Sequence, residues 1–258
     1  MQASLFATEE SASPPSPVWV GCAGWSLPRA AWPEFPATGT HLQRYAARLN
    51  AVEINSSFYR PHQPTTYARW AASVPEDFRF SVKLPKTITH QQRLVDCAAL
   101  LDDFLAQVTC LGERLGCLLV QLPPSLEFDA AAVQDFLRAL RERHTGAVAL
   151  EPRHASWFDA PADTLLDAWQ VGRVLADPQV AAAGRVPGGF AGLVYVRLHG
   201  SPRMYYSAYP PAVLDALVVR LDAAARSGAS AWCIFDNTAE GAAVADALYT
   251  LQALAEKF

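Results

Sequence analysis

Short apolar segments alternate along the chain with longer segments in which apolar residues return every three or four positions. The short segments predict eight strands, near residues 18–22, 51–55, 78–83, 117–122, 147–151, 171–176, 193–199 and 231–236. The longer segments predict helices near residues 41–49, 64–73, 97–114, 130–143, 161–169, 210–227 and 240–256. A regular alternation of strands and helices is typical of a parallel sheet covered by helices.

The number of strands favours a closed barrel over an open sheet. Eight strand–helix units in about 250 residues are the usual content of a TIM-type barrel, and the chain has 258 residues. The sequence has no Gly-rich dinucleotide-binding turn, which weakens the open-sheet alternative. We therefore predict an α/β fold, a single parallel eight-stranded (β/α)8 barrel over residues 18–258. Residues 1–17 lack periodicity and are expected to form a flexible leader.

Alternation within the strands predicts which side chains face the inside of the barrel, since neighbouring residues of a strand point to opposite faces. The strands near 51–55, 78–83 and 193–199 each have one apolar and one polar face. The polar faces end in Glu53 and Asn55, in Lys83, and in Arg197 and His199. We expect the apolar faces to pack on the helices and the polar faces to line the interior.

The same alternation adds polar residues from the remaining strands. These are, in strand order, Gln121, Glu151 followed by Arg153, Asp177, and either Asp236 or Asn237. Charges inside a barrel are costly unless they are paired or hydrated. Their convergence predicts a functional site at the C-terminal ends of the strands, where barrels of this type carry their active sites.

Glu151, Arg153 and His154 supply the side-chain types that proton transfer requires. A carboxylate can act as acid or base, a guanidinium can hold an anion, and an imidazole can shuttle a proton. The structural alternative is an ion pair of Glu151 with Arg153 or Arg197 that ties strands together. Arg197 and His199 suit an anion clamp beside a proton-exchanging group, or an arginine that neutralises buried carboxylates beside a hydrogen-bonded histidine.

Glu53 and Lys83 form a second candidate pair. They are an acid and a base or a simple interior salt bridge, and a Lys83 amine whose pKa is lowered by burial can also form a Schiff base. His90 follows the third strand, where it either reaches the site or lies in solvent. The remaining polar residues expected to bind substrate are Asn55, Gln121, Asp177 and Asn237.

Aromatic residues follow the ends of several predicted strands. They are Trp25, Phe58, Tyr59, Trp157, Tyr205 and Tyr206. As a group they are candidates to wall a pocket for a ring or sugar, and individually they are candidates for packing within loops.

A metal site is an alternative use of the same strand ends. Glu151, Asp177, His199 and Asp236 come from four successive strands and include ligand types that suit a divalent cation. Two arginines beside them, Arg153 and Arg197, would repel a cation. We therefore expect no metal and no other cofactor, with a divalent metal as the alternative.

Composition supports a folded chain and limits its partners. Hydrophobic residues make up 51% and charged residues 18%, which allows a large core. A net charge of -4 provides no global attraction for nucleic acid, although it allows a local basic patch. Five cysteines without CxxC spacing predict reduced thiols. With no membrane-length apolar run and no signal-like start, we expect a cytoplasmic protein without a membrane partner.

An ordered series of short motifs runs through the chain. It comprises Gly21-Cys22-Ala23-Gly24-Trp25, the segment from Val52 to Tyr59, Phe80-Ser81-Val82-Lys83 with Thr89-His90, Gln121-Leu122-Pro123-Pro124, the segment from Glu151 to Trp157, the segment from Tyr195 to Gly200, and Asp236-Asn237 with Gly241. Over about residues 18–256 the chain resembles the YecE-like family, known as domain of unknown function seventy-two. The resemblance implies a TIM-type barrel and no established reaction or cofactor. The chain departs from the family pattern at Asp236 and Asp246, where asparagines are common.

We expect an enzyme that acts on a small anionic substrate, bearing a phosphate or carboxylate, by general acid/base chemistry. The expected catalytic residues are Glu53, Glu151, His154 and His199, and the expected anion ligands are Lys83, Arg153 and Arg197. Hydrolysis, elimination and isomerisation all fit this set. Two alternatives stay open: a metal-assisted phosphoesterase or nuclease-like enzyme, and a non-catalytic module that binds an anion.

Overall fold

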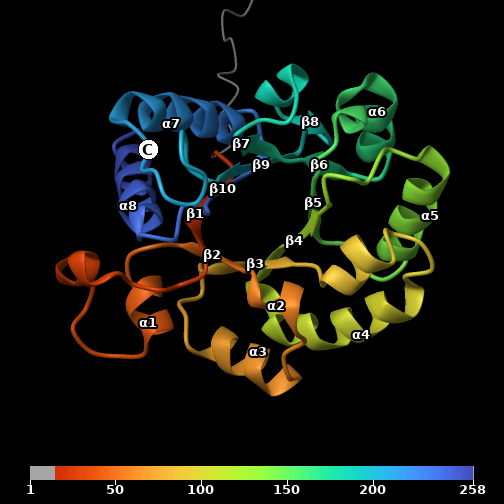
Figure 1. Cartoon of the computed structure of the whole chain (residues 1–258). Coiled ribbons are helices and arrows are strands. Elements are labelled where there is room, and N and C mark those ends of the chain that lie inside the picture. Colours follow the sequence, from red (N-terminus) through yellow and green to blue (C-terminus); the bar gives the residue numbers. More distant parts are fainter. Residues whose placement is uncertain (1–14, 258) are drawn as a thin grey trace, which may run out of the picture.

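The strands curl into a nearly closed barrel surrounded by helices (Figure 1) in a computed structural model that describes residues 15–257. The ten strands of this part of the chain are β1 (Val18–Ala23), β2 (Ala51–Ile54), β3 (Arg79–Lys83), β4 (Leu115–Gln121), β5 (Ala147–Glu151), β6 (Val171–Arg173), β7 (Leu175–Asp177), β8 (Gly188–Gly189), β9 (Leu193–Leu198) and β10 (Ser230–Phe235). The α-helices are α1 (His41–Ala46), α2 (Ser56–Tyr59), α3 (Pro64–Ala72), α4 (Ala98–Val108), α5 (Ala130–Arg141), α6 (Ala160–Ala168), α7 (Pro211–Arg226) and α8 (Ala242–Ala255).

The sheet departs from the predicted eight parallel strands at one place. Its order is β7-β9-β10-β1-β2-β3-β4-β5-β6-β8. The predicted strand 171–176 is interrupted at Val174, because β6 pairs with β5 while β7 pairs with β9. β8 then adds two residues antiparallel to β6. The α/β class and the barrel-like sheet are confirmed, but the sheet has ten strands of mixed direction instead of eight parallel ones.

All seven predicted helices are present, and some have shifted ends with local causes. α1 begins at a capping box, in which the Thr40 hydroxyl accepts from the Gln43 N–H and the Gln43 side chain accepts from the Thr40 N–H. The predicted helix 97–114 ends early at Val108. A 3-10 segment follows it, and Gly112 there has a φ of 56° that an α-helix does not allow. The sequence reasoning missed α2, a single turn too short to show periodicity.

Apolar residues pack on both faces of the sheet, whereas the alternation predicted that only the face toward the helices is apolar. Val52, Ile54 and Val196 belong to the larger core cluster, which includes residues from the surrounding helices. Residues of the opposite parity, including Tyr195 and Trp232, form a separate smaller cluster. The residues of this smaller cluster contact one another inside the barrel, below the C-terminal ends of the strands. Polar side chains of the same parity occupy the interior at the C-terminal ends.

The predicted leader falls mostly outside the described part of the chain. Residues 1–14 lie outside it, and residues 15–17 precede β1. The Ser16 N–H donates to Ala225 O at 3.0 Å, so this end of the leader contacts the end of α7. No helix within residues 15–257 has the length and apolar character needed to cross a membrane. All five cysteines are free thiols, as predicted.

Candidate active site

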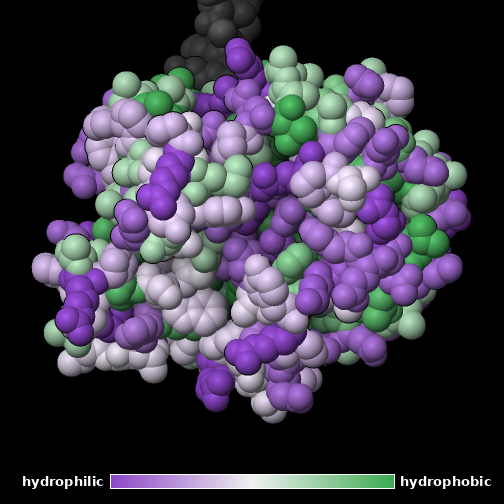
Figure 2. Space-filling model, in the orientation of Figure 1, coloured by the Kyte–Doolittle hydropathy of each residue, from purple (hydrophilic) through white to green (hydrophobic). Residues whose placement is uncertain are grey.

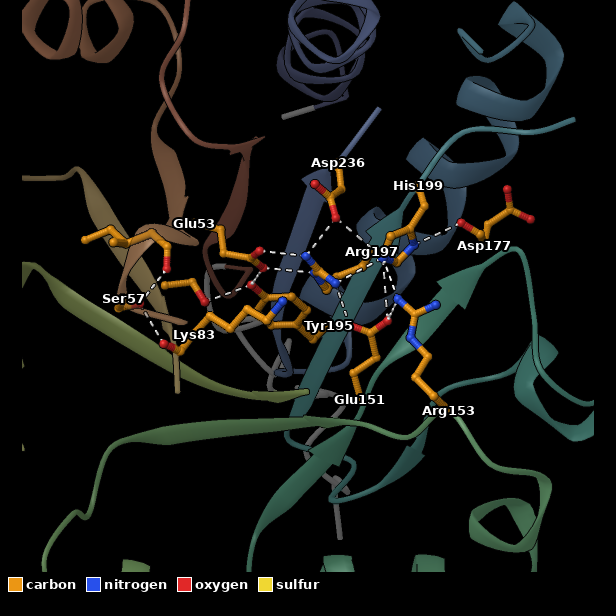
Figure 3. A network of polar contacts seen from close by, with 12 residues as sticks. Glu53, Ser57, Lys83, Glu151, Arg153, Asp177, Tyr195, Arg197, His199 and Asp236 are labelled. Atoms are coloured by element: carbon orange, nitrogen blue, oxygen red, sulfur yellow. Dashed lines mark hydrogen bonds and ion pairs between the residues drawn. The ribbon is translucent and has the colours of Figure 1, made fainter. Parts of the chain in front are cut away.

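Arg197, near the end of β9, lies at the centre of a polar network in the upper barrel (Figure 3). Its Nε donates to Glu53 Oε2 (3.0 Å), and its Nη2 donates to Glu53 Oε1 (2.7 Å) and Asp236 Oδ2 (3.0 Å). Its Nη1 donates to Glu151 Oε2 (2.5 Å) and His199 Nε2 (3.0 Å). A guanidinium has five N–H groups, and all five are engaged here. Arg197 therefore organises the network and has no donor left for a substrate, contrary to its predicted role as an anion ligand.

Seven residues contribute to the charged end of the barrel, and we call them the mouth network. They are Glu53, Lys83, Glu151, Arg153, Arg197, His199 and Asp236. They come from β2, β3, β5, β9 and the first two residues after β5, β9 and β10. Hydrophilic side chains gather around a hollow at the centre of the face seen in Figure 2, over the ring of strands in Figure 1.

Glu151 is a permanent anion in this setting. Its side chain is fully buried, and burial alone would raise its pKa. Arg197 and Arg153 outweigh burial and hold the pKa of Glu151 at about 2. Arg153 Nη2 contacts the second carboxylate oxygen, Oε1. Glu151 therefore binds arginines and does not exchange protons near neutral pH.

The hydrogen bonds of His199 determine its protonation. Its Nδ1 lies 3.1 Å from Asp177 O, and a carbonyl can only accept, so the proton is on Nδ1. Its Nε2 accepts from Arg197 Nη1 and from Arg153 Nη2 (2.7 Å). Burial and these cations lower the pKa of His199 to about 3. The neutral imidazole thus positions two arginines and has no lone pair available for a proton shuttle.

Asp236 is a carboxyl group of the mouth network with a raised pKa. Burial raises its pKa from 3.8 to about 6, against the lowering effect of Arg197. Its side chain is 15% exposed, so a substrate can reach it. The predicted ambiguity between Asp236 and Asn237 is resolved by strand parity, because Asp236 continues the inward face of β10. Carboxyls with such shifted pKa values are typical of sites of proton transfer.

Two cations of the mouth network keep uncommitted donors. The Nε of Arg153 is buried without a hydrogen-bond partner, and its Nη1 has no hydrogen bond to any residue of the described range. The Lys83 ammonium lies 4.2 Å from the centre of the Phe58 ring and makes no hydrogen bond or ion pair within residues 15–257. Burial and Arg197 lower the pKa of Lys83. A buried donor without a partner is unusual and calls for an explanation.

Two residues of the network floor were not among the predicted site residues. The Tyr195 hydroxyl donates to Glu53 Oε2 (2.9 Å) and lies 2.8 Å from Ser81 Oγ. Both face inward for the same reason as Arg197 and Lys83, two residues further along each strand. Strand alternation places both on the inward face, but an uncharged hydroxyl there carries no sequence signal for a site.

Three predicted residues lie at the rim of the mouth network. His90 packs edge-on against Phe58 with the ring centres 4.9 Å apart, and burial followed by the charge of Lys83 lowers its pKa. Asn55 Oδ1 is buried without a hydrogen-bond partner. Gln121 Nε2 donates to Leu122 O at 3.0 Å. These side chains border the network without entering its ion pairs.

Three other predicted residues face elsewhere. The Asp177 carboxylate accepts from the Tyr209 hydroxyl (2.7 Å), so only its backbone carbonyl faces His199. Asn237 follows the inward-facing Asp236, and its Nδ2 therefore reaches toward α8 and donates to Asp246 Oδ2 (2.7 Å). Trp157 is fully buried and donates through Nε1 to a backbone carbonyl in the loop after β4. These positions give none of the three side chains a direct route to a substrate in the barrel.

The remaining predicted residues pack within loops or on the surface. His154 Nδ1 pairs with the hydroxyl of its neighbour Ser156 at 2.9 Å. Trp25 packs edge-on against Trp70, and Tyr59 is 71% exposed. Tyr206 lies under the Arg203 guanidinium, 3.7 Å from the ring centre. Of the four predicted metal ligands, Glu151, His199 and Asp236 meet in the mouth network, whereas the Asp177 carboxylate faces Tyr209. Among residues 15–257 no three His, Cys, Asp or Glu side chains are arranged to hold a metal ion.

Two curated proteins are similar in sequence to part of the chain. UPF0759 protein YecE from Escherichia coli K12 is 33% identical over 142 residues, which are 55% of this chain and 50% of that protein. UPF0759 protein YunF from Bacillus subtilis is 27% identical over 150 residues, which are 56% of this chain and 53% of that protein. The chain thus spans about half the length of the curated relatives it matches.

Solved structures and a family model cover almost the whole chain. A DUF72 family protein from Thermotoga maritima superposes with a TM-score of 0.75 at 25% identity, over 92% of this chain and 99% of that one. A DUF72 family protein from Enterococcus faecalis superposes with a TM-score of 0.78 at 20% identity, over 92% and 95% of the two chains. The family model described as "Protein of unknown function DUF72" matches residues 19–258. The chain therefore belongs to the DUF72 family of YecE-like proteins.

Proposed function

We propose that the mouth network is the active site of an enzyme that acts on a small anionic substrate by general acid/base chemistry. The observation that carries the proposal is the pairing of unused donors with a carboxyl of shifted pKa. Arg153 has a buried Nε without a partner, and Asp236 has a pKa of about 6. Binding an anion and moving a proton at neutral pH require these two features together.

The proposed roles differ from residue to residue. Arg153 binds the phosphate or carboxylate of the substrate through Nε and Nη1. Asp236 gives and takes the proton, because its pKa lies close to the working pH. Arg197, Glu151 and His199 are positioning residues, since their polar atoms are already engaged with one another.

A second candidate is a module that binds the same anion without converting it. It is supported by the single protonation states of Glu151 and His199, whose pKa values of about 2 and 3 keep both groups from exchanging protons near neutral pH. Binding alone requires Arg153 and no proton carrier. The two candidates therefore differ in the effect of Asp236→Asn.

The test combines ligand binding with conversion. The protein is screened by thermal shift against phosphorylated and carboxylated metabolites, since saturation at a hundred times Kd stabilises the folded state by about 2.7 kcal/mol. Each ligand that binds is then followed by NMR for conversion. Arg153→Ala should weaken binding at least tenfold, about the effect of losing a charged hydrogen bond. Asp236→Asn should bind normally and convert about a hundredfold more slowly.

Controls and outcomes distinguish the candidates. Arg138→Ala removes an exposed ion pair with Asp135 and should change neither binding nor conversion. Ligands bound equally well by Arg153→Ala would contradict the anion site. Tight binding with no conversion of any ligand would favour the binding module over the enzyme.

A further inference from the structure

Lys83 is an unusual residue in this chain. The sequence has 21 Lys and Arg residues, of which only Lys83, Lys86 and Lys257 are lysines. Lys86 and Lys257 are exposed, so Lys83 is the one lysine inside the barrel. The other cations of the mouth network, Arg153 and Arg197, are arginines that pair with carboxylates. Positive charge in this interior is otherwise supplied by arginines. The lysine at position 83 therefore suggests that an amine is required there.

Burial and the charge of Arg197 lower the pKa of the Lys83 amine. The carboxylates of Glu53, Glu151 and Asp236 act against this shift, as does the face of the Phe58 ring, which attracts a cation. Lys83 Nζ lies 4.2 Å from the centre of the Phe58 ring, whose edge contacts with Tyr59 and His90 keep it in place. The backbone is held as well, because the Ser57 hydroxyl donates to Lys83 O at 2.7 Å. No carboxylate of the described residues forms an ion pair with Nζ. An amine that is desolvated, unpaired and near other cations is the usual setting of a nucleophilic lysine.

We propose that Lys83 attacks a carbonyl group of the substrate and forms a Schiff base, so that the substrate is an aldehyde or ketone that also carries a carboxylate or phosphate. This inference rests on the proposed function, since it uses the anion site at Arg153 and the proton carrier Asp236. It adds a covalent step and narrows the substrate from any small anion to a carbonyl compound.

The step balances with groups that the mouth network contains. The Nζ lone pair forms a bond to the carbonyl carbon, and the carbonyl oxygen takes the proton of the Asp236 carboxylic acid. The Asp236 carboxylate then removes a proton from Nζ, which leaves a neutral carbinolamine. Asp236 returns this proton to the hydroxyl group, which leaves as water while the Nζ lone pair forms the C=N bond. The products are a cationic Schiff base, one water molecule and an ionised Asp236 beside the new cation.

The inference is tested by reductive trapping on the full chain at neutral pH. The protein is incubated with glyoxylate and sodium cyanoborohydride, and the modified lysines are found by peptide mass spectrometry. Lys86 and Lys257 are controls within the same molecule. A lowered pKa raises the free fraction of an amine, so we expect more adduct on Lys83 than on either control. Equal labelling of the three lysines would overturn the inference.

Two variants separate the inference from the function on which it rests. Lys83→Arg keeps a long side chain but removes the amine, so it should lose the adduct, whereas an equal total adduct in this variant would show that Lys83 is not the nucleophile. Arg153→Ala should reduce trapping by glyoxylate and leave trapping by uncharged acetaldehyde unchanged. If Arg153→Ala leaves both unchanged while Lys83 is still labelled, the anion site fails and the Schiff base stands.

Discussion

The Arg197 guanidinium holds the charged side chains of the candidate site together. Arg197 donates to five acceptors on four side chains, and two of these, Glu53 and Glu151, are fully buried carboxylates. Buried charges are tolerated only with well-placed partners, and the loss of one partner leaves the others uncompensated. Arg197 is thus the residue on which the ionisation of the mouth network depends.

We predict that Arg197→Met lowers the free energy of unfolding by about 3–5 kcal/mol, because it leaves two buried carboxylates without their shared partner. Urea unfolding at pH 7 measures this change. Arg138→Met, which removes an exposed ion pair with Asp135, is the control and should cost less than about 1 kcal/mol. Similar small losses in both variants would show that the carboxylates do not depend on Arg197.

At the scale of elements, a helix side chain helps to join two strands. The Tyr45 hydroxyl, from α1, accepts from the Cys22 N–H (2.8 Å) on β1 and donates to Ala51 O (2.9 Å) on β2. Gly21 provides the room, since a Cβ there would lie 2.8 Å from that hydroxyl and against the Ala51 carbonyl. This packing gives a physical reason for the glycine that opens the first motif of the chain.

We predict that Tyr45→Phe lowers the free energy of unfolding by about 1–3 kcal/mol, because a backbone N–H and a carbonyl lose a buried partner. Tyr249→Phe is the matched control, since its hydroxyl donates to Asp215 on the surface. It should cost less than about 1 kcal/mol by chemical denaturation. Equal costs for the two changes would indicate that water replaces the Tyr45 hydroxyl.

At the scale of the whole molecule, the site couples protonation to folding in two opposite ways. Glu151 has a folded pKa of about 2, below its ordinary value of 4.5, so its contribution to stability is lost as the pH falls between these values. Asp236 has a folded pKa of about 6, above its ordinary value of 3.8. Between these pH values the folded protein therefore binds more protons than the unfolded chain. The contribution of Asp236 to the free energy of unfolding falls as the pH rises through this range.

We predict that Asp236→Asn becomes more stable relative to the unmodified protein as the pH rises from about 4 to 7. The variant lacks the carboxyl group whose ionisation is disfavoured in the folded state, with Arg197, Glu53, Lys83 and Glu151 as its charged neighbours. The difference in the free energy of unfolding should grow by on the order of 2–3 kcal/mol across this range. Denaturant unfolding at several pH values measures it, and a constant difference would mean that Asp236 ionises normally.

Several features followed from the sequence by itself. Apolar periodicity predicted seven of the helices and the position of almost every strand, because burial of one face is a local requirement that each segment meets separately. Strand parity correctly placed Glu53, Lys83 and Arg197 on the inward face, since it depends only on the alternation of neighbouring side chains. The motifs also predicted the DUF72 family, which the family model confirms.

Other features were decided only by the tertiary structure, because they depend on residues far apart in the chain. Arg197 meets Glu53 across 144 positions, and only the assembled barrel shows that its donors are all engaged. The split between β6 and β7 depends on which neighbour each half can pair with. The pKa of Asp236 follows from burial and from charges on other strands. Local pattern thus determines which face a side chain occupies, whereas distance and dielectric surroundings determine its chemistry.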